Sequence, residues 1–245
     1  MNSFRVAIGM AICTQRERVL LYEGEKTWIR PLSWITFMVL TPYNSKFHLP
    51  SFVELRSSTE NIWKNIDNTY QIVEELLTVM YSTLEPKDYY LKIDADTLVV
   101  PKHLQSFLRT HHGNIDYFGS DLISTKNVKI LGKKINYAQG GIEGLSYRFI
   151  QTVVNDMCIQ KIGDLACSKK YCLNKLEDVA LGACAKFHNV SLFSYPCFFA
   201  WGPCNIYKPD TCKNKVCEET ISIHKLKHVE WYRLWWNYLS TNRNS

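Results

Sequence analysis

Strand-like and helix-like segments alternate along this chain, and that order restricts the fold more than any other feature of the sequence. Short runs of β-branched and apolar residues predict strands at 4–12, 36–40, 89–93, 116–119 and 190–193. Apolar residues at helical spacing predict helices at 61–84, 101–109, 145–159, 177–187 and 228–239. Such alternation is typical of an α/β domain whose mostly parallel sheet is covered by helices on both faces. In these sheets, ligands bind beyond the carboxyl ends of the strands.

The length and charge of the chain narrow its class further. Its 245 residues, 46% of them hydrophobic, fit one α/β domain with a sizeable core. A balance of 29 Lys and Arg against 23 Asp and Glu gives a net charge of +6, which suits a small anionic ligand such as a nucleotide diphosphate. Because the basic residues are scattered, no nucleic-acid partner is predicted. The apolar start, Met1–Cys13, is too short to span a bilayer and has no cleavage site, so the sequence by itself predicts a cytoplasmic protein with no membrane span.

Nine cysteines leave three interpretations open. Disulfides would imply a luminal or secreted setting. A structural zinc site would use the group in the last third of the chain, although no Cys-x-x-Cys pair occurs there. Free buried thiols are favoured for Cys13, Cys158 and Cys184. The Asn189-Val190-Ser191 triplet has the pattern of a glycosylation site, which arises often by chance.

The segment Asp94-Ala95-Asp96 carries the central chemical signal. It follows the apolar strand expected at 89–93, so two carboxylates stand at the end of a strand. Bare carboxylates would repel a diphosphate, whereas a divalent cation can bind carboxylate oxygen on one side and phosphate oxygen on the other. Hard oxygen ligands favour Mn²⁺ or Mg²⁺. A solvated turn is the ordinary alternative for an isolated Asp-x-Asp, and the preceding strand favours the metal site.

Two adjacent acids, Glu177 and Asp178, begin the helix expected at 177–187. The helix dipole favours negative charge at that end, so capping is the simpler explanation. The functional alternative gives one acid the role of a base, because inverting transfer to a hydroxyl group requires a group that accepts its proton. We favour Asp178 over Glu177 for that role.

Two further segments are weaker signals when taken alone. Gly140 and Gly141 predict a flexible turn where the backbone can approach a ligand closely. His224 follows a short apolar run and is expected at the end of a strand. A single histidine is more often structural, but a metal held by two aspartates needs additional ligands.

Together these segments resemble, in the same order, the β-1,3-glycosyltransferases of the Fringe and core 1 galactosyltransferase type. The resemblance covers most of the chain and is carried by five segments: Lys26-Thr27-Trp28, Tyr90–Val99, Tyr137–Ser146, Leu176–Cys184 and Ile221–His224. Ala95 stands where the family usually has a middle acid, while the outer two acids are intact. The glycine loop also looks one residue shorter before Ser146 than in the family.

The resemblance implies a GT-A fold and an inverting, metal-dependent transfer of a hexose or N-acetylhexosamine from a UDP-sugar to a glycan or glycoprotein acceptor. It implies a nucleotide-binding part at about 1–125, an acceptor-binding part at about 126–245, and the Golgi or secretory lumen as the compartment. Carried over residue by residue, it assigns the following roles: Asp96, Asp94 and His224 as ligands of Mn²⁺ or Mg²⁺, Asp178 as the base, Thr14 and Arg18 near the nucleotide, and Gly140, Gly141 and Glu177 along the acceptor and donor loop.

Two other functions compete with an active transferase. A catalytically inactive relative would bind glycans or proteins, and the intact acids speak against it. A zinc-stabilised interaction module would use Cys204, Cys212, Cys217 and His224. Donor hydrolysis in the presence of Mn²⁺ separates the first alternative from an enzyme, and metal analysis of the purified protein identifies the second.

Overall fold

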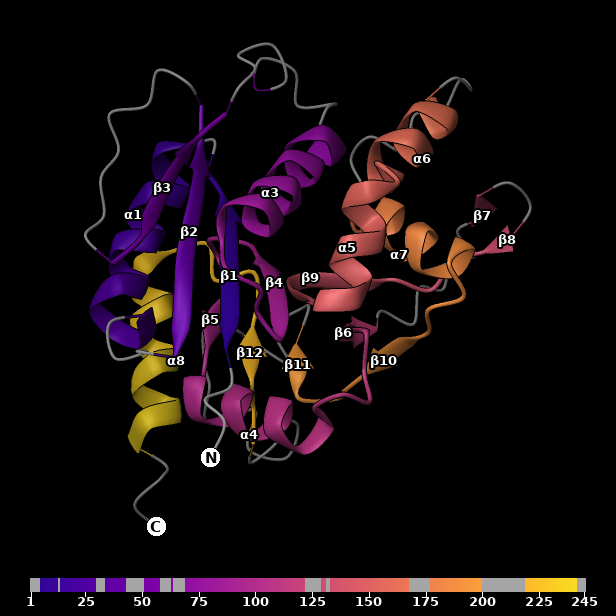
Figure 1. The fold of residues 1–245 in the computed structure, drawn as a ribbon. Helices are drawn as coiled ribbons and strands as arrows, with labels where there is room; N and C mark the ends of the chain where they lie inside the picture. Colours follow the sequence, from indigo (N-terminus) through magenta and orange to yellow (C-terminus); the bar gives the residue numbers. More distant parts are fainter. Residues whose placement is uncertain are drawn as a thin grey trace.

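A mixed seven-stranded sheet forms the centre of the molecule (Figure 1). The computed structural model describes residues 5–12, 14–29, 34–42, 51–57, 63, 69–121, 129–130, 133–167, 177–199 and 219–241. The strands lie in the order β10, β6, β9, β4, β1, β2, β3. Their bounds are β1 Val6–Ala11, β2 Ile35–Thr41, β3 Val53–Arg56, β4 Tyr89–Ile93, β6 Tyr117–Asp121, β9 Ala138–Ser146 and β10 Leu192–Ser194. Only β9 runs antiparallel to its neighbours, so the expected α/β class with a mostly parallel sheet is confirmed.

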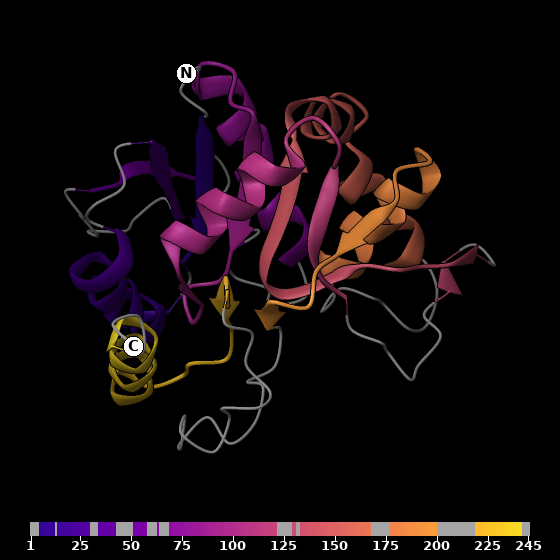
Figure 2. The same cartoon turned by 90° about the horizontal axis from the view of Figure 1, so that it is seen from below.

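Helices cover both faces of this sheet, and each face has its own hydrophobic core. Residues of α3 Thr69–Thr83, α5 Tyr147–Asn155, α6 Cys158–Cys167 and α7 Glu177–Phe187 pack in one core. Residues of α1 Gln15–Gly24, the π-helical turn Glu25–Ile29, α4 Pro101–His111 and α8 Val229–Thr241 pack in the other. Both views place α8 beside α1 (Figures 1 and 2). In β1, Ile8 and Met10 enter one core and Ala7 the other, as the alternation of side chains along a strand requires.

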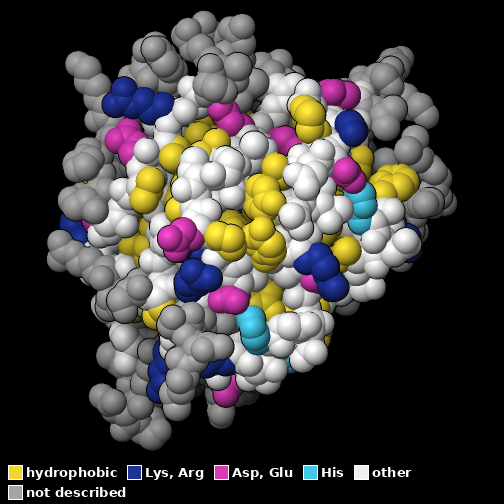
Figure 3. All heavy atoms as spheres, viewed as in Figure 1, with side chains coloured by type: hydrophobic (Ala, Val, Ile, Leu, Met, Phe, Trp, Pro, Cys, Tyr) yellow, Lys and Arg dark blue, Asp and Glu magenta, His cyan; other side chains and the backbone are white. Residues whose placement is uncertain are grey.

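Two small sheets complete the described structure. One joins β11 Phe198–Phe199, β12 Ser222–Ile223 and β5 Leu98–Val99, and the other pairs β7 Lys129–Ile130 with β8 Lys133–Lys134. Among the described residues, no helix is both long and apolar enough to cross a membrane. On the face shown in Figure 3, Lys and Arg side chains lie apart from one another among acidic and apolar ones.

Two predictions about local structure are wrong. Gly140 and Gly141 lie inside strand β9 and form no turn, because the segment pairs with both β4 and β6. The helix expected at 145–159 is two helices, α5 and α6. Between them Met157 has a φ of 49°, which an α-helix does not accommodate. The helix expected at 61–84 is described as α3 from Thr69, and most of its earlier part lies outside the described residues.

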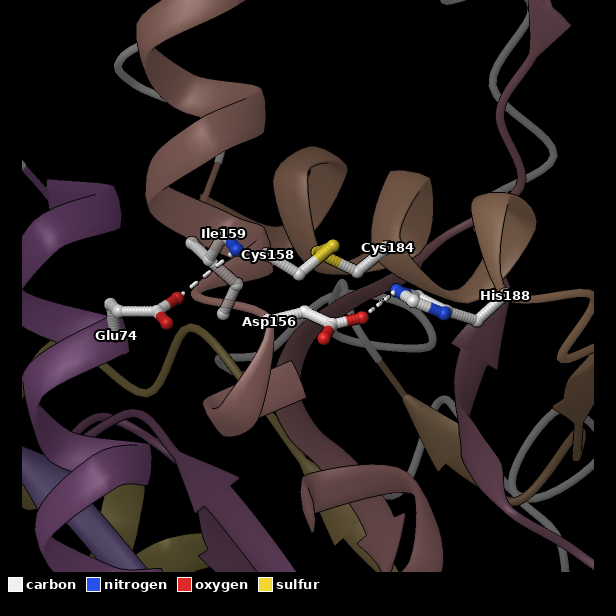
Figure 4. The surroundings of a disulfide bond; sticks show 6 residues. All are labelled: Glu74, Asp156, Cys158, Ile159, Cys184 and His188. Atoms are coloured by element: carbon white, nitrogen blue, oxygen red, sulfur yellow. Dashed lines mark hydrogen bonds and ion pairs between the residues drawn. A yellow bond between two sulfur atoms is a disulfide. The ribbon is translucent and has the colours of Figure 1, made fainter. Parts of the chain in front are cut away.

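A disulfide links Cys158 in α6 to Cys184 in α7 (Figure 4), so the prediction of free thiols at these two positions is wrong. The two helices pack against each other and bring the Cα atoms to 5.8 Å, although the cysteines are 26 residues apart in sequence. That pairing follows from tertiary packing, which the spacing of cysteines does not reveal. Cys197 is buried. Cys13, Cys204, Cys212 and Cys217 lie outside the described residues.

Glu74 of α3 is buried beside this disulfide and accepts a hydrogen bond from the Ile159 backbone amide at 3.1 Å (Figure 4). Burial raises the pKa of Glu74 from 4.5 to about 7. Between these two values the native chain keeps a proton that the unfolded chain has released, so the free energy of unfolding falls as the pH rises through this window.

Replacing Glu74 with glutamine removes the free-energy cost of burying an ionised carboxylate at high pH. The amide stays neutral, and its oxygen can still accept the hydrogen bond. Glu74→Gln is therefore expected to raise the free energy of unfolding at pH 8 by about 1–3 kcal/mol, and to leave it nearly unchanged at pH 4.5. Urea denaturation at both pH values measures the difference. The control is Glu85→Gln at an 85% exposed side chain. Equal stability of Glu74→Gln and the native protein at pH 8 would contradict this account.

Candidate active site

A cavity of about 380 Å³ opens at the carboxyl ends of β1 and β4. The starts of α1 and α3 border it on one side, and the segment after β12 borders it on another. Its charged and polar lining includes Thr14, Arg16, Lys92, Asp94, Asp96, Glu177, Lys225 and Lys227. This is the position at which open α/β sheets bind ligands.

Two of these lining residues, Asp94 and Asp96, meet the expected histidine, His224, which is buried next to them and is not itself among the lining residues. The Nε2 atom of His224 lies 3.2 Å from Asp94 Oδ2 and 2.9 Å from Asp96 Oδ1. One potential ligand atom from each residue lies within 4.8 Å of the others. Two carboxylates and an imidazole form a donor set that suits Mn²⁺ and similar divalent cations. The residues present therefore fit the metal that the sequence predicts.

The strand pairing explains how residues 128 positions apart in the chain come together at this edge. Asp94 and Asp96 lie in the turn between β4 and β5, which is closed by a hydrogen bond from the Thr97 amide to the Asp94 carbonyl. Ile223 of β12 pairs antiparallel with Leu98 of β5, so His224 comes next to the turn. The Leu226 amide then donates to the Asp96 carbonyl at 3.0 Å. The backbone thus fixes the imidazole against the two carboxylates.

Charge and burial act in opposite directions on this group. Burial alone would raise the pKa of Asp94, but the positive charge of Lys92 and the contact with His224 lower it below its usual range. Burial alone would lower the pKa of His224, whereas its hydrogen bonds to Asp94 and Asp96 raise it. At neutral pH the carboxylate of Asp94 is therefore ionised, which is the state that a metal ligand requires.

Gly141 lies against Thr97 and His224, next to the group of Asp94, Asp96 and His224. A Cβ atom at this position would lie 2.7 Å from Thr97 Cγ2 and 3.0 Å from His224 Cβ. Contacts this short cannot be accommodated without displacing one of the two residues. The absence of a side chain at Gly141 therefore allows β9 to pack against His224.

Gly141→Ala is expected to lower the free energy of unfolding by about 1–3 kcal/mol and to weaken Mn²⁺ binding by about tenfold, because His224 must shift. Urea denaturation and calorimetric titration with Mn²⁺ measure the two effects. Gly113→Ala is the control: Gly113 has a φ of 77° and open space around it, so alanine there adds backbone strain away from the site. An unchanged Mn²⁺ affinity in Gly141→Ala would contradict the expected shift.

A buried lysine and a buried glutamate, neither of them expected from the sequence, lie under the same cavity. Lys92 Nζ contacts Asp94 Oδ1 at 3.0 Å and Glu143 Oε1 at 2.9 Å. It also approaches the two acids that begin α7: Glu177 Oε1 at 3.5 Å and Asp178 Oδ1 at 3.6 Å. The signal in the sequence was a lysine inside an otherwise apolar strand, since such a residue is seldom buried without an acidic partner.

The two acids of α7 differ in their relation to the cavity. Glu177 is one of the residues that line it, and Asp178 is not. Both side chains are mostly buried, with exposures of 22% for Glu177 and 14% for Asp178. Burial raises the pKa of Glu177, although Lys92 acts against that shift. The structure thus brings both acids to the same cation and places only one of them on the cavity wall.

Thr14 and Arg16 lie at the start of α1, on one side of the cavity. Thr14 lines the cavity and caps α1, since its side chain accepts a hydrogen bond from the Glu17 amide and Glu17 accepts one from the Thr14 amide. Arg16 lines the cavity, whereas Arg18 is not among its lining residues. The Arg16 Nε atom donates to the Lys227 carbonyl at 3.1 Å. The Thr14-x-x-Glu17 spacing, which is that of a capping box, could have revealed this helix start.

No protein-family model matches the chain, and no curated protein sequence matches it. Solved structures do match it. The galactosyltransferase LgtC, in complex with donor and acceptor sugar analogs, matches with a TM-score of 0.58 and 12% sequence identity, over 96% of each chain. A glycosyltransferase involved in glycosylation of the major capsid of PBCV-1 matches with a TM-score of 0.50 and 12% identity, over 94% of this chain and 99% of that one. Mouse xyloside xylosyltransferase 1 matches with a TM-score of 0.51 and 7% identity, over 90% of this chain and 97% of that one. This chain therefore has the GT-A type fold of these glycosyltransferases.

Proposed function

We propose that this protein is a metal-dependent glycosyltransferase that moves a sugar from a nucleotide-sugar donor to a hydroxyl group. The observation that carries the proposal is the convergence of Asp94, Asp96 and His224, of which the two aspartates line the cavity. They lie where a nucleotide-binding α/β sheet binds its ligand. Donor and acceptor sugar analogs bound to LgtC, which has the same fold, support sugar transfer as the reaction class.

In this proposal the residues of the cavity divide the binding of the donor between them. Asp94, Asp96 and His224 would hold Mn²⁺ or Mg²⁺, whose positive charge would offset that of the diphosphate leaving group. Arg16, Lys225 and Lys227 line the same cavity and add positive charge where the phosphates would lie. Thr14 and Arg16, which both line the cavity, would lie near the nucleotide, and the same role for Arg18 stays a prediction of the resemblance.

The choice of donor, acceptor and linkage rests on the resemblance to the Fringe and core 1 galactosyltransferase type. The donor would be a UDP-hexose or UDP-N-acetylhexosamine, the acceptor a glycan or glycoprotein, and the product a β-1,3 linkage formed with inversion. Inversion requires the acceptor hydroxyl to attack the sugar from the side opposite the leaving diphosphate. The resemblance assigns Asp178 as the base, and Asp178 begins α7 beside Glu177, which lines the cavity. Gly140 and Gly141 support the site from β9.

The proposal keeps the division of the chain into two parts that the resemblance implies. The metal-binding turn belongs to the nucleotide-binding part at about 1–125, while Asp178 and His224 belong to the acceptor-binding part at about 126–245. The contact of His224 with two carboxylates supports this site over a zinc module with cysteines. The Cys158–Cys184 disulfide supports an oxidising compartment such as the secretory lumen.

A panel of nucleotide sugars tests the proposal. The full chain is incubated with each donor, Mn²⁺ and a set of glycan acceptors, and products are analysed by mass spectrometry and NMR. The expected result is turnover of one donor that stops when EDTA removes the metal, with an inverted anomeric centre in the product. No turnover and no donor-dependent rise in thermal stability with any nucleotide sugar would contradict the proposed enzyme. Retention of configuration would contradict the base assigned to Asp178 only.

A further inference from the structure

One buried cation lies between the metal-binding turn and the start of α7. The Lys92 side chain is 5% exposed, and its Nζ atom lies within 3.6 Å of oxygens from four acids: Asp94, Glu143, Glu177 and Asp178. One of these acids, Glu143, belongs to the neighbouring strand β9, one follows β4 directly, and two begin α7. The ammonium group is therefore the point at which three segments of the site meet.

We propose that Lys92 is a positioning residue, whose ammonium group holds the metal-binding carboxylate of Asp94 in register with the acids that begin α7. This inference rests on the proposed function, because Lys92 would align the donor side of the transferase site with its acceptor side. Lys92 thereby acts through the groups that it contacts, without a reacting atom of its own.

The geometry at Asp94 gives the first reason. Its two carboxylate oxygens have different partners: Oδ1 contacts Lys92 at 3.0 Å, and Oδ2 contacts His224 at 3.2 Å. Lys92 thus fixes the rotation of the carboxylate and leaves Oδ2 on the side of the metal-binding group. A carboxylate held by a charge-assisted hydrogen bond keeps one orientation better than one held by packing alone.

The electrostatics at the start of α7 give the second reason. Asp94, Glu177 and Asp178 would place three negative charges close together in a partly buried region, where like charges repel strongly. The cation between them removes this repulsion and allows α7 to begin next to the metal-binding turn. Without it, the simplest relief is for the first turn of α7 to move away.

A variant that also changes Glu143 can test whether Lys92 positions the site or only forms a structural ion pair. Glu143 lies directly opposite Lys92 in the β4–β9 pair and is fully buried, and its Oε2 atom has no hydrogen-bond partner among the described residues. Removing Lys92 alone would leave this acid buried without its cation, so Lys92→Met is at risk of failing to fold. The double variant Lys92→Met/Glu143→Gln removes one positive and one negative group and keeps similar side-chain volumes.

The double variant is compared with the native protein and with Lys102→Met, an exposed lysine in α4. We expect it to stay folded by circular dichroism, with kcat lowered by about 100-fold and the donor KM changed by less than about threefold. The split is expected at saturating Mn²⁺, because Asp94 and Asp96 both keep their contacts with His224, while the α7 acids lose their alignment. A folded double variant with native kcat would overturn the proposal, and so would an equal loss in Lys102→Met.

Hydrogen–deuterium exchange gives a readout that does not depend on activity. The peptide covering 177–187 is expected to exchange at least about tenfold faster in the double variant, because its first turn has lost its anchor, while Lys102→Met exchanges like the native protein. Native exchange over 177–187 in the double variant would overturn the positioning role. If the native chain turns over no nucleotide sugar, the proposed function fails, and the exchange comparison still tests Lys92.

Discussion

Replacing Asp96 with alanine is expected to abolish the dependence of UDP binding on Mn²⁺. Asp96 Oδ1 lies 2.9 Å from His224 Nε2 and supplies one of three ligand positions in a group that spans at most 4.8 Å. With two ligands left, affinity for Mn²⁺ should fall by about 100-fold or more. The diphosphate would then face the remaining carboxylate of Asp94 with no cation between them, so binding of UDP should weaken as well.

Isothermal titration measures this effect directly, with UDP added to the protein in Mn²⁺ and in EDTA. The native chain should bind UDP much more tightly in Mn²⁺, and Asp96→Ala should bind it equally weakly in both. Glu85→Ala removes an acid that is 85% exposed and should behave like the native chain. An Asp96→Ala variant that retains the native, Mn²⁺-dependent affinity would show that the metal lies elsewhere or is not required.

Asp178→Asn should lower turnover by about 10²–10⁴-fold while donor binding is retained, as expected when a general base is lost. The substitution keeps the shape of the side chain and removes its ability to accept a proton at neutral pH. Asp178 and Glu177 lie at nearly the same distance from Lys92, 3.6 and 3.5 Å, so both variants perturb that cation to a similar degree. Any difference between them therefore reports on the chemical step.

Glu177→Gln is the matched variant in this comparison, and single-turnover kinetics with saturating donor is the measurement. We expect a clearly smaller loss of turnover than in Asp178→Asn, with a larger change in donor affinity, because Glu177 lines the donor cavity. The reverse pattern, native turnover in Asp178→Asn and a large loss in Glu177→Gln, would transfer the role of base to Glu177.

Several strands and helices could be predicted because they depend on local patterns, whereas α1, β3 and β9 were not expected. The apolar run Tyr89–Ile93 and the acids Glu177 and Asp178 at a helix start have short-range signals, and β4 and α7 begin where those signals indicated. The prediction of a turn at Gly140 and Gly141 was wrong because the structure of this segment depends on long-range pairing. Whether a glycine pair makes a turn or continues a strand depends on its partners, and here β9 lies between β4 and β6.

The types of residue in the site could be predicted from the sequence, but most of the contacts between them could not. Asp94, Asp96 and His224 were grouped by their order in a resemblance, and the β5–β12 pairing brings them together. The cluster around Lys92 depends on the register of β4 and β9, which places Glu143 opposite the lysine. The Cys158–Cys184 disulfide likewise depends on the packing of α6 against α7. Long-range register of this kind has no short-range signal in the sequence.

A crystal structure with Mn²⁺ and UDP, recorded at a wavelength where manganese scatters anomalously, tests the central claim most directly. We predict one anomalous peak in contact with carboxylate oxygens of Asp94 and Asp96 and with the His224 imidazole, and the UDP diphosphate on its other side. Manganese bound away from these three residues, or UDP bound in the cavity without manganese, would contradict the claim.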